Sequence, residues 1–396
     1  MYKVSLITVV ILILCIFIDF TFLNFIENKN ISTRLTILLS LFSGLYIAFK
    51  LNKKNIKKNF FKKRKENLIR VKIKFYTFLS IWLISIFFSV FMSCYLNQNL
   101  YYYYYYDSLI FSPFILFIFY FWVFYMDSRQ EDPDDEYANF FLDIKKKRFS
   151  WDSYRLFLLN TAVKVFYIPF MYGAAFLAVS QVLTYGDIFF NILKFINFLF
   201  LIGVCFDVCI GLGGYIFSSK FFATETISVD GSWQGWLVCL ICYPPLVILS
   251  KIFLVQTDSY IWSHWLKPDE TLYWIWATLI CLTWTCYWLA TVSFGFKFSN
   301  LSWRGLVDTG LYRYVKHPAY LSKNIYWWLH TIPLFGVVGI DMLRNVLALS
   351  IISLIYYLRA KTEEKHLMQF DEYIQYCRWI DQNGFYAKIK KIFKIS

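Results

Sequence analysis

The feature that most restricts this sequence is a series of apolar runs, many of them near twenty residues long, that recur along its 396 residues. A helix of about 20 residues crosses the roughly 30 Å of hydrocarbon in a bilayer, and few other structures satisfy their backbone there. The sequence therefore predicts an all-α, polytopic integral membrane protein with about ten transmembrane helices. The expected spans are Val4–Phe25, Leu35–Leu51, Phe75–Leu96, Ser108–Met126, Leu156–Leu183, Ile188–Phe217, Trp236–Val255, Leu272–Phe294, Leu321–Phe335 and Met342–Leu358, the last two as a tight hairpin that turns at Gly336–Asp341.

The composition agrees with a chain that is surrounded by lipid. Hydrophobic residues make up 59% and charged residues 17% of the chain, whereas soluble domains average about 45–50% and 25%. These values exclude a disordered chain, a collagen-like chain and an ordinary soluble enzyme. The net charge of +14 comes from basic residues between apolar runs, so we expect the lipid bilayer and its anionic headgroups as partners, and no nucleic acid.

The distribution of lysine and arginine predicts the orientation in the membrane. Basic loops lie on the cytoplasmic side, which places Lys50–Lys74, Lys145–Arg148 and Lys388–Lys394 inside. One alternating path satisfies all three, and it makes the N and C termini cytoplasmic. We interpret Val4–Phe25 as a retained span and not as a signal peptide, because its basic n-region is too short and no small-residue cleavage site follows.

The chain divides into two regions by its motifs. Residues 1–150 hold four expected spans and very polar cytoplasmic loops, and residues 151–396 hold every recognisable motif, mainly within residues 294–380. Gly211–Gly214 lies inside an expected span with no strand before it, so it predicts close helix packing and not a dinucleotide site. Cys239 and Cys242 form a C-x-x-C that lacks partners for zinc, so we expect packing residues and no metal.

Polar and aromatic residues gather in the loop 296–320 and at the end of the last span. Pro318 fixes a bend and restricts His317 before it, and the nearby tyrosines offer ring faces on which an adenine could stack. Arg359 and Glu363 are four residues apart and share one helix face. Two interpretations of that spacing stay open: a simple ion pair at the membrane interface, or part of a site for a polar, partly cationic cofactor.

These two segments resemble a known family. Residues 306–320, LVDTGLYRYVKHPAY, are similar to the LV-x-x-G-x-Y-x-x-x-R-H-P-x-Y signature of the isoprenylcysteine carboxyl methyltransferases, a group that also includes phospholipid methyltransferases. The R-x-x-x-E-E of residues 359–364 and the later F-x-E-Y-x-x-Y are similar as well. Lys316 replaces the usual arginine and loses its planar fork, and a glycine usual before Tyr373 is missing. The resemblance covers about a fifth of the chain.

The resemblance implies an activity, a cofactor and a set of site residues. It implies an S-adenosylmethionine-dependent methyltransferase that is a multi-pass membrane protein, in the inner membrane of a bacterium or the endoplasmic reticulum of a eukaryote. The acceptor would be lipid-like or prenylated, with carboxyl O-methylation favoured. Arg359 would orient the acceptor, and the cofactor would lie against Leu306, Val307, Tyr312, His317, Pro318, Tyr320, Glu363 and Glu364.

Two other functions are open at this point. Membrane NADPH-dependent sterol-type reductases share a similar G-L-x-x-Y-x-x-H-P-x-Y string, but the Arg359–Glu364 segment favours the methyltransferase. A transporter or scaffold would need a polar path of intramembrane charges, and the sequence has few. The identity of the acceptor and the oligomeric state are not indicated.

One expectation concerns two charges inside the spans and does not depend on the resemblance. Charged side chains are costly in mid-bilayer and usually have a partner. Lys164 and Asp207 lie at similar depths, roughly 12 and 15 Å from the cytoplasmic ends of consecutive expected helices. A short turn joins those helices, so they should be neighbours. We therefore expect a buried ion pair that fixes the helix register or lines an acceptor cavity.

Overall fold

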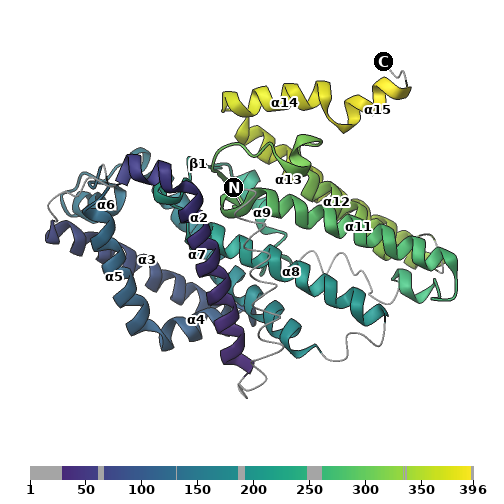
Figure 1. The fold of residues 1–396 in the computed structure, drawn as a ribbon, viewed down its shortest axis with the longest axis horizontal. Helices are drawn as coiled ribbons and strands as arrows, with labels where there is room; N and C mark the ends of the chain where they lie inside the picture. The colour runs from purple at the N-terminus through teal and green to yellow at the C-terminus, as the bar shows by residue number, and fades with distance from the viewer. Residues whose placement is uncertain are drawn as a thin grey trace. The chain divides into compact units, whose positions relative to one another are not determined.

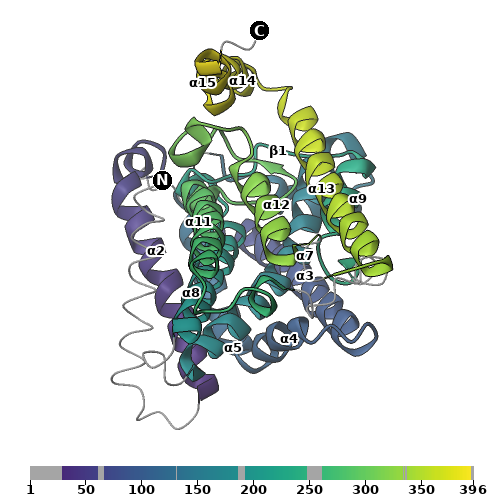
Figure 2. The same ribbon diagram turned by 90° about the vertical axis from the view of Figure 1, so that its right-hand side faces the viewer.

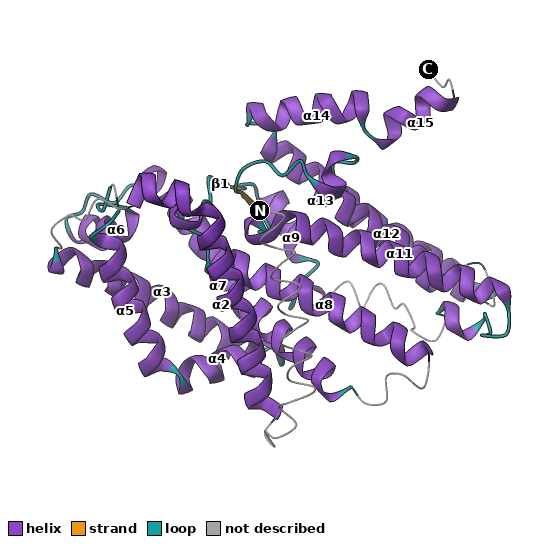
Figure 3. Cartoon of the chain, viewed as in Figure 1, coloured by secondary structure: helices purple, strands orange, loops and turns teal. Residues whose placement is uncertain are grey.

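The structure is a computed structural model, and it describes residues 29–60, 67–130, 132–185, 192–247, 261–332, 334 and 337–393. Most of these residues are helical and very few are in strands (Figures 1 and 3), which confirms the predicted all-helical class. The first expected span, Val4–Phe25, lies outside the described residues. The α-helices are α2 (Lys29–Phe60), α3 (Leu68–Cys94), α4 (Leu100–Ile110), α5 (Ser112–Asp127), α6 (Glu136–Lys145), α7 (Trp151–Thr184), α8 (Ile192–Ile216), α9 (Trp233–Leu240), α11 (Thr271–Phe294), α12 (Pro318–Thr331), α13 (Ile340–Leu367), α14 (Asp371–Asn383) and α15 (Phe385–Phe393).

Five helices in the described part of the chain are long and apolar enough to cross a membrane: α3, α7, α8, α11 and α13. Helices α4 and α5 meet at 75° and make a sixth candidate if they cross together. These helices support a multi-pass membrane protein. The total of about ten spans and the cytoplasmic position of both termini stay predictions.

The expected span Trp236–Val255 is wrong as a continuous helix. Helix α9 ends at Leu240, and turns follow it through residue 246. Pro244 and Pro245 stand in this turn region, and each lacks the N–H that a helix interior requires. The rest of that range, from residue 248, lies outside the described residues.

The contacts divide the chain into two compact units, which we describe separately. The first holds the described residues up to Val229 together with Phe296–Arg304, and the second holds Asp230–Gly295 and the described residues from Gly305 on. The division expected near residue 150 was drawn from motifs and loop composition, and it stays a prediction.

Helix α7 is at the centre of the first unit and packs against α2, α3, α4 and α8. Gly173 permits its approach to α4, because a Cβ there would collide with the backbone of Leu100. Arg34 of α2 holds Asp107 of α4 through Nε and Nη2, at 2.8 and 2.6 Å, and Tyr172 of α7 donates to the same carboxylate. Buried polar pairs of this kind fix how neighbouring helices meet.

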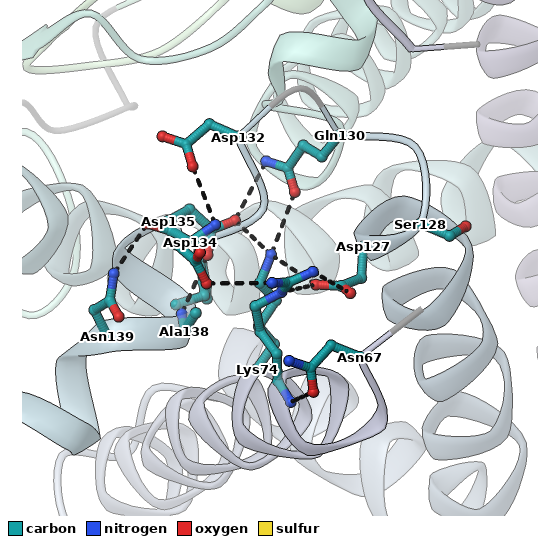
Figure 4. Close-up of polar contacts among 12 residues, drawn as sticks. Asn67, Lys74, Asp127, Ser128, Gln130, Asp132, Asp134, Asp135, Ala138 and Asn139 are labelled. Atoms are coloured by element: carbon teal, nitrogen blue, oxygen red, sulfur yellow. Dashed lines mark hydrogen bonds and ion pairs between the residues drawn. The ribbon is translucent and has the colours of Figure 1, made fainter. Parts of the chain in front are cut away.

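A second ionic cluster joins α3 to the segment around α5 and α6 (Figure 4). Arg70 donates from Nε and Nη2 to the two carboxylate oxygens of Asp127, at 2.7 and 3.0 Å. Lys74 lies 3.4 Å from Asp127 and 3.0 Å from Asp135, whose other oxygen caps α6 at Ala138. The side chain of Asp127 is fully buried, so its charge is compensated by two cations in a dry environment.

The glycine-rich end of α8 receives the segment 296–304. A Cβ at Gly214 would lie 2.5 Å from the carbonyl oxygen of Phe298, and a Cβ at Gly213 would lie 2.5 Å from the ring of Phe296. This confirms close packing as the reason for the glycines: Gly213 and Gly214 pack against the segment 296–304, and Gly211 packs against that segment and against Met171 of α7. The same segment forms β2 (Ser302–Trp303), which pairs antiparallel with β1 (Ser228–Val229).

The expected ion pair between Lys164 and Asp207 is not formed. Among the ion pairs of the described residues, none joins these two side chains, and the charge that acts on Lys164 is the guanidinium of Arg304. The prediction assumed that a partner had to come from the next helix. The glycines of α8 bring a loop to this position, and that loop carries a cation.

In the second unit, α12 and α13 form the predicted hairpin. Helix α11 packs along α12, α12 packs along α13, and α9 packs against α13, an order that can be followed in two views (Figures 1 and 2). Trp276 of α11 donates from its indole N–H to the carbonyl of Leu329, at 2.8 Å. Trp328 of α12 donates to Ser353 of α13 at 3.0 Å, and Ser353 donates to Asn324 at 2.7 Å. The hairpin therefore brings the two sequence motifs together at one end.

Candidate active site

The motif loop presents its histidine at the first turn of α12. The 3-10 helix η7 (Gly310–Arg313) precedes it, and Pro318 begins α12. Proline suits this first position, because its missing N–H would have no helical partner. His317 is the N-cap residue with extended φ, so its ring projects from the helix start.

Two glutamates from α13 meet this histidine. Glu364 lies 3.2 Å from Nε2 of His317, and Lys361 donates to its other oxygen at 3.2 Å. Glu363 accepts from the Tyr320 hydroxyl at 2.9 Å through Oε2, which is also 3.9 Å from Nδ1 of His317. Sequence positions more than forty residues apart thus form one cluster of acid, base and phenol.

The two glutamates differ in what remains open to a ligand. The side chain of Glu364 is 18% exposed and both of its oxygens have partners, whereas that of Glu363 is 39% exposed. Within the described chain, both contacts of Glu363 go to Oε2, and none is made by Oε1. Oε1 of Glu363 can accept a hydrogen bond from an added polar group.

Tyr320 connects this cluster to the buried arginine. Its ring stacks on His317 with centroids 5.6 Å apart, and the guanidinium of Arg359 lies 5.0 Å from the same ring. Arg359 is buried, lies 5.8 Å from the Tyr243 ring and contacts the sulfur of Cys239 at 3.8 Å. The ion pairs of the described residues do not include Arg359 with Glu363, so the simple helical pair is not the arrangement adopted.

The segment after α13 is tied to the motif loop. Tyr376 of α14 donates to the carbonyl oxygens of Tyr312, at 2.7 Å, and Val315, at 3.4 Å. Lys316 forms an ion pair with Asp381 at 2.8 Å. The lysine that replaces the usual arginine therefore binds α14, for which a bidentate fork is not needed.

Four of the predicted cofactor residues, Leu306, Val307, Tyr312 and Pro318, are not part of the hydrogen-bonded cluster around the two carboxylates in the described structure. Tyr312 is buried with its ring edge against Phe294, at 4.8 Å between centroids, and this burial raises the pKa of its hydroxyl well above the usual range. Leu306 and Val307 are half-buried in the loop before η7. Their roles toward a cofactor stay predictions.

Several neighbours of the site carried no sequence signal that pointed to this site. Cys239 and Tyr243 lie in the region of α9 that the sequence assigned to a plain span, and they line Arg359. Lys361 is part of the charged helix end, and Tyr356 stacks on Tyr320 at 6.2 Å. Their proximity depends on the packing of α9, α12 and α13, which no local pattern encodes.

Comparison with known proteins gives one match, to the isoprenylcysteine carboxyl methyltransferase (ICMT) family, over residues 272–369. It confirms the resemblance, and the matched range contains the loop motif, residues 359–364 and the hairpin between them, whereas the later F-x-E-Y-x-x-Y element follows it. No curated protein matches the chain, and no solved structure does. The match supports a membrane methyltransferase.

Proposed function

We propose, from the family match of residues 272–369, that this chain is an integral-membrane methyltransferase that uses S-adenosylmethionine. The acceptor is a lipid-like or prenylated molecule, and the reaction favoured is O-methylation of its carboxylate. The cofactor binds from the cytoplasmic side, and the acceptor comes from the bilayer. The observation that carries this proposal is the cluster of His317, Tyr320, Glu363 and Arg359.

The donor set around Glu363 fits such a cofactor. The cofactor carries a cationic sulfonium, an α-amino group, ribose hydroxyls and an adenine ring. A half-exposed carboxylate with one oxygen still able to accept suits the amino or hydroxyl groups, and the rings of Tyr320 and His317 suit stacking or cation contact. Glu364 is held by His317 and Lys361, so its part is to fix the histidine.

Arg359 fits the binding of an anionic acceptor. A guanidinium that is buried between aromatic rings keeps its charge and gives up little hydration. Its planar fork matches a carboxylate, and a low dielectric strengthens that contact. Because the Tyr320 ring touches both Arg359 and His317, an acceptor held by Arg359 lies next to the proposed cofactor position.

The chemistry needs little from the protein beyond position. When bound, the cofactor supplies an activated methyl group. A carboxylate nucleophile is already ionised at neutral pH, so no general base is required. Arg359 orients the acceptor carboxylate, the carboxylate of Glu363 offsets positive charge, and the aromatic rings exclude water.

The proposal is tested with purified full-length protein in detergent. Titration calorimetry with S-adenosylhomocysteine and, separately, NADPH distinguishes the methyltransferase from the reductase. Radiolabelled S-adenosylmethionine with whole lipid extracts then reports transfer. We expect binding of S-adenosylhomocysteine and label in a lipid fraction, and binding of NADPH alone would overturn the proposal.

A further inference from the structure

Arg304 is a buried cation in the first unit that forms no ion pair with any of the described residues. Only 4% of its surface is exposed. Its Nη1 donates to the carbonyl oxygens of Gly214, at 2.6 Å, and Phe298, at 3.1 Å. Its Nε and Nη2 are buried and find no acceptor among the described residues. Unmade hydrogen bonds on a buried charged group are costly.

Nε and Nη2, the unused atoms of Arg304, form one edge of its guanidinium. In two other arginines of the same unit, this edge binds a carboxylate. Arg34 holds Asp107 through Nε and Nη2, and Arg70 holds Asp127 through the same two atoms. In Arg304 the backbone carbonyls occupy Nη1 and leave this edge open. The two N–H groups of this edge are coplanar and suit two oxygens of one anion.

Lys164 adds a second positive charge within electrostatic range of Arg304. It is half-buried on α7, it takes part in no ion pair of the described residues, and Arg304 acts on it as a like charge. Burial lowers the pKa of Arg304 to about 10, so the guanidinium is still protonated at pH 7. Two cations without an ion-pair partner among the described residues, of which Arg304 is buried from solvent, favour the binding of an anion between or beside them.

Nearby polar atoms are also without partners. The buried Oγ of Ser302, two residues before Arg304, and the buried Oδ1 of Asn160, one helical turn before Lys164, have no hydrogen bond in the described structure. The Ser302 hydroxyl can donate to an anion, whereas Oδ1 of Asn160 is an acceptor and cannot. The Ser302 hydroxyl and the open edge of Arg304 are therefore donors without an acceptor among the described residues.

We propose that Arg304 and Lys164 form a binding site for a phosphate group, with the Ser302 hydroxyl as a further donor. A phosphate carries one or two negative charges and several acceptor oxygens. It can therefore pair with both cations and accept hydrogen bonds from the open edge of the guanidinium. Its source is the headgroup of an anionic phospholipid or free phosphate. This site lies wholly within the first unit.

The experiment compares full-length protein with two variants and a matched control. Lys164→Met keeps the length of the side chain and removes its charge, and Arg304→Lys keeps a donor for the Gly214 carbonyl but loses the fork. Arg148→Gln removes an exposed cation of the same unit and serves as the control. Binding is measured in neutral detergent at constant ionic strength, with phosphatidylglycerol in one arm and inorganic phosphate in the other.

We expect the dissociation constant to rise about tenfold or more in both variants and to stay unchanged in the control. An effect in the phosphatidylglycerol arm alone identifies a lipid headgroup, and an effect with inorganic phosphate identifies a free phosphate site. Lys164→Met is the decisive variant if Arg304→Lys fails to fold. Equal binding of both probes by wild type and Lys164→Met, or no binding by either, overturns the proposal.

Discussion

Two clusters of charged side chains can be compared: the ionic cluster between α3, α5 and α6, and the motif cluster of His317, Tyr320, Glu363 and Glu364 between α12 and α13. They use the same kinds of side chain in opposite ways. In the first, Asp127 is fully buried and both of its oxygens are held by Arg70. In the second, Glu363 is 39% exposed and keeps one oxygen without a contact in the described structure. A saturated cluster stabilises packing, whereas an unsaturated and accessible cluster can bind a ligand.

This difference predicts which variants fail by unfolding and which fail by losing a ligand. Polar residues within a membrane protein are retained for either reason. The type of residue does not distinguish a stabilising cluster from a ligand-binding one, since arginine and carboxylates occur in both. The number of unused hydrogen-bonding atoms distinguishes them.

The largest effect is expected for Asp127→Leu. The change removes the buried negative charge that compensates the positive charges of Arg70 and Lys74. Breaking a buried ion pair in this way lowers the free energy of unfolding by roughly 3–5 kcal/mol. Thermal unfolding in detergent measures it, with Asp132→Leu as an exposed control from the same segment. The double variant Arg70→Met/Asp127→Leu should recover part of the loss, and a double variant worse than Asp127→Leu would contradict a simple ion pair.

Glu363→Gln should affect binding and spare the fold. Loss of a charge-assisted bond costs on the order of 1–3 kcal/mol, so affinity for S-adenosylhomocysteine should fall while the unfolding temperature stays the same. Glu270→Gln, at an exposed position of the same unit, is the control. Unchanged affinity would remove Glu363 from the cofactor site.

Arg359→Lys separates cofactor from acceptor. Lysine keeps the charge but has no planar fork, so turnover should fall while affinity for S-adenosylhomocysteine is retained. Arg344→Lys on the same helix, where Arg344 pairs with Asp341 at 3.6 Å, controls for a general effect on α13. Full activity of Arg359→Lys would indicate a neutral or amine acceptor.

A smaller effect is expected where α14 is tied to the motif loop. Tyr376→Phe removes the hydroxyl that binds the Tyr312 carbonyl, and a typical bond of this kind contributes about 1 kcal/mol. Proteolysis or hydrogen exchange of α14 should increase, with a modest loss of cofactor affinity. No change in either measurement would show that the contact does not hold α14.

The smallest effect is expected for Asp381→Asn. Its partner Lys316 is 2.8 Å away, but the Asp381 side chain is 64% exposed. Exposed ion pairs contribute about 0–1 kcal/mol and weaken with salt. A change in unfolding temperature that persists at high salt would contradict this assignment.

The sequence by itself determined the helical class, the position of most long helices and both halves of the motif cluster. Apolar runs near the thickness of a bilayer leave few alternatives to helices, and Pro318 fixes where α12 begins. The spacing also placed Arg359 and Glu363 on one helix. It could not decide whether they pair, because that depends on where Tyr320, Cys239 and Tyr243 pack.

Tertiary structure alone decided the rest. The partner expected for Lys164 was Asp207 on the next helix, but the glycines at the end of α8 admit the segment 296–304 and bring Arg304 there. The ties from α14 to the motif loop are likewise packing outcomes. A periodic pattern specifies which face of a helix is apolar, whereas polar partners are chosen by close approaches between segments distant in the chain.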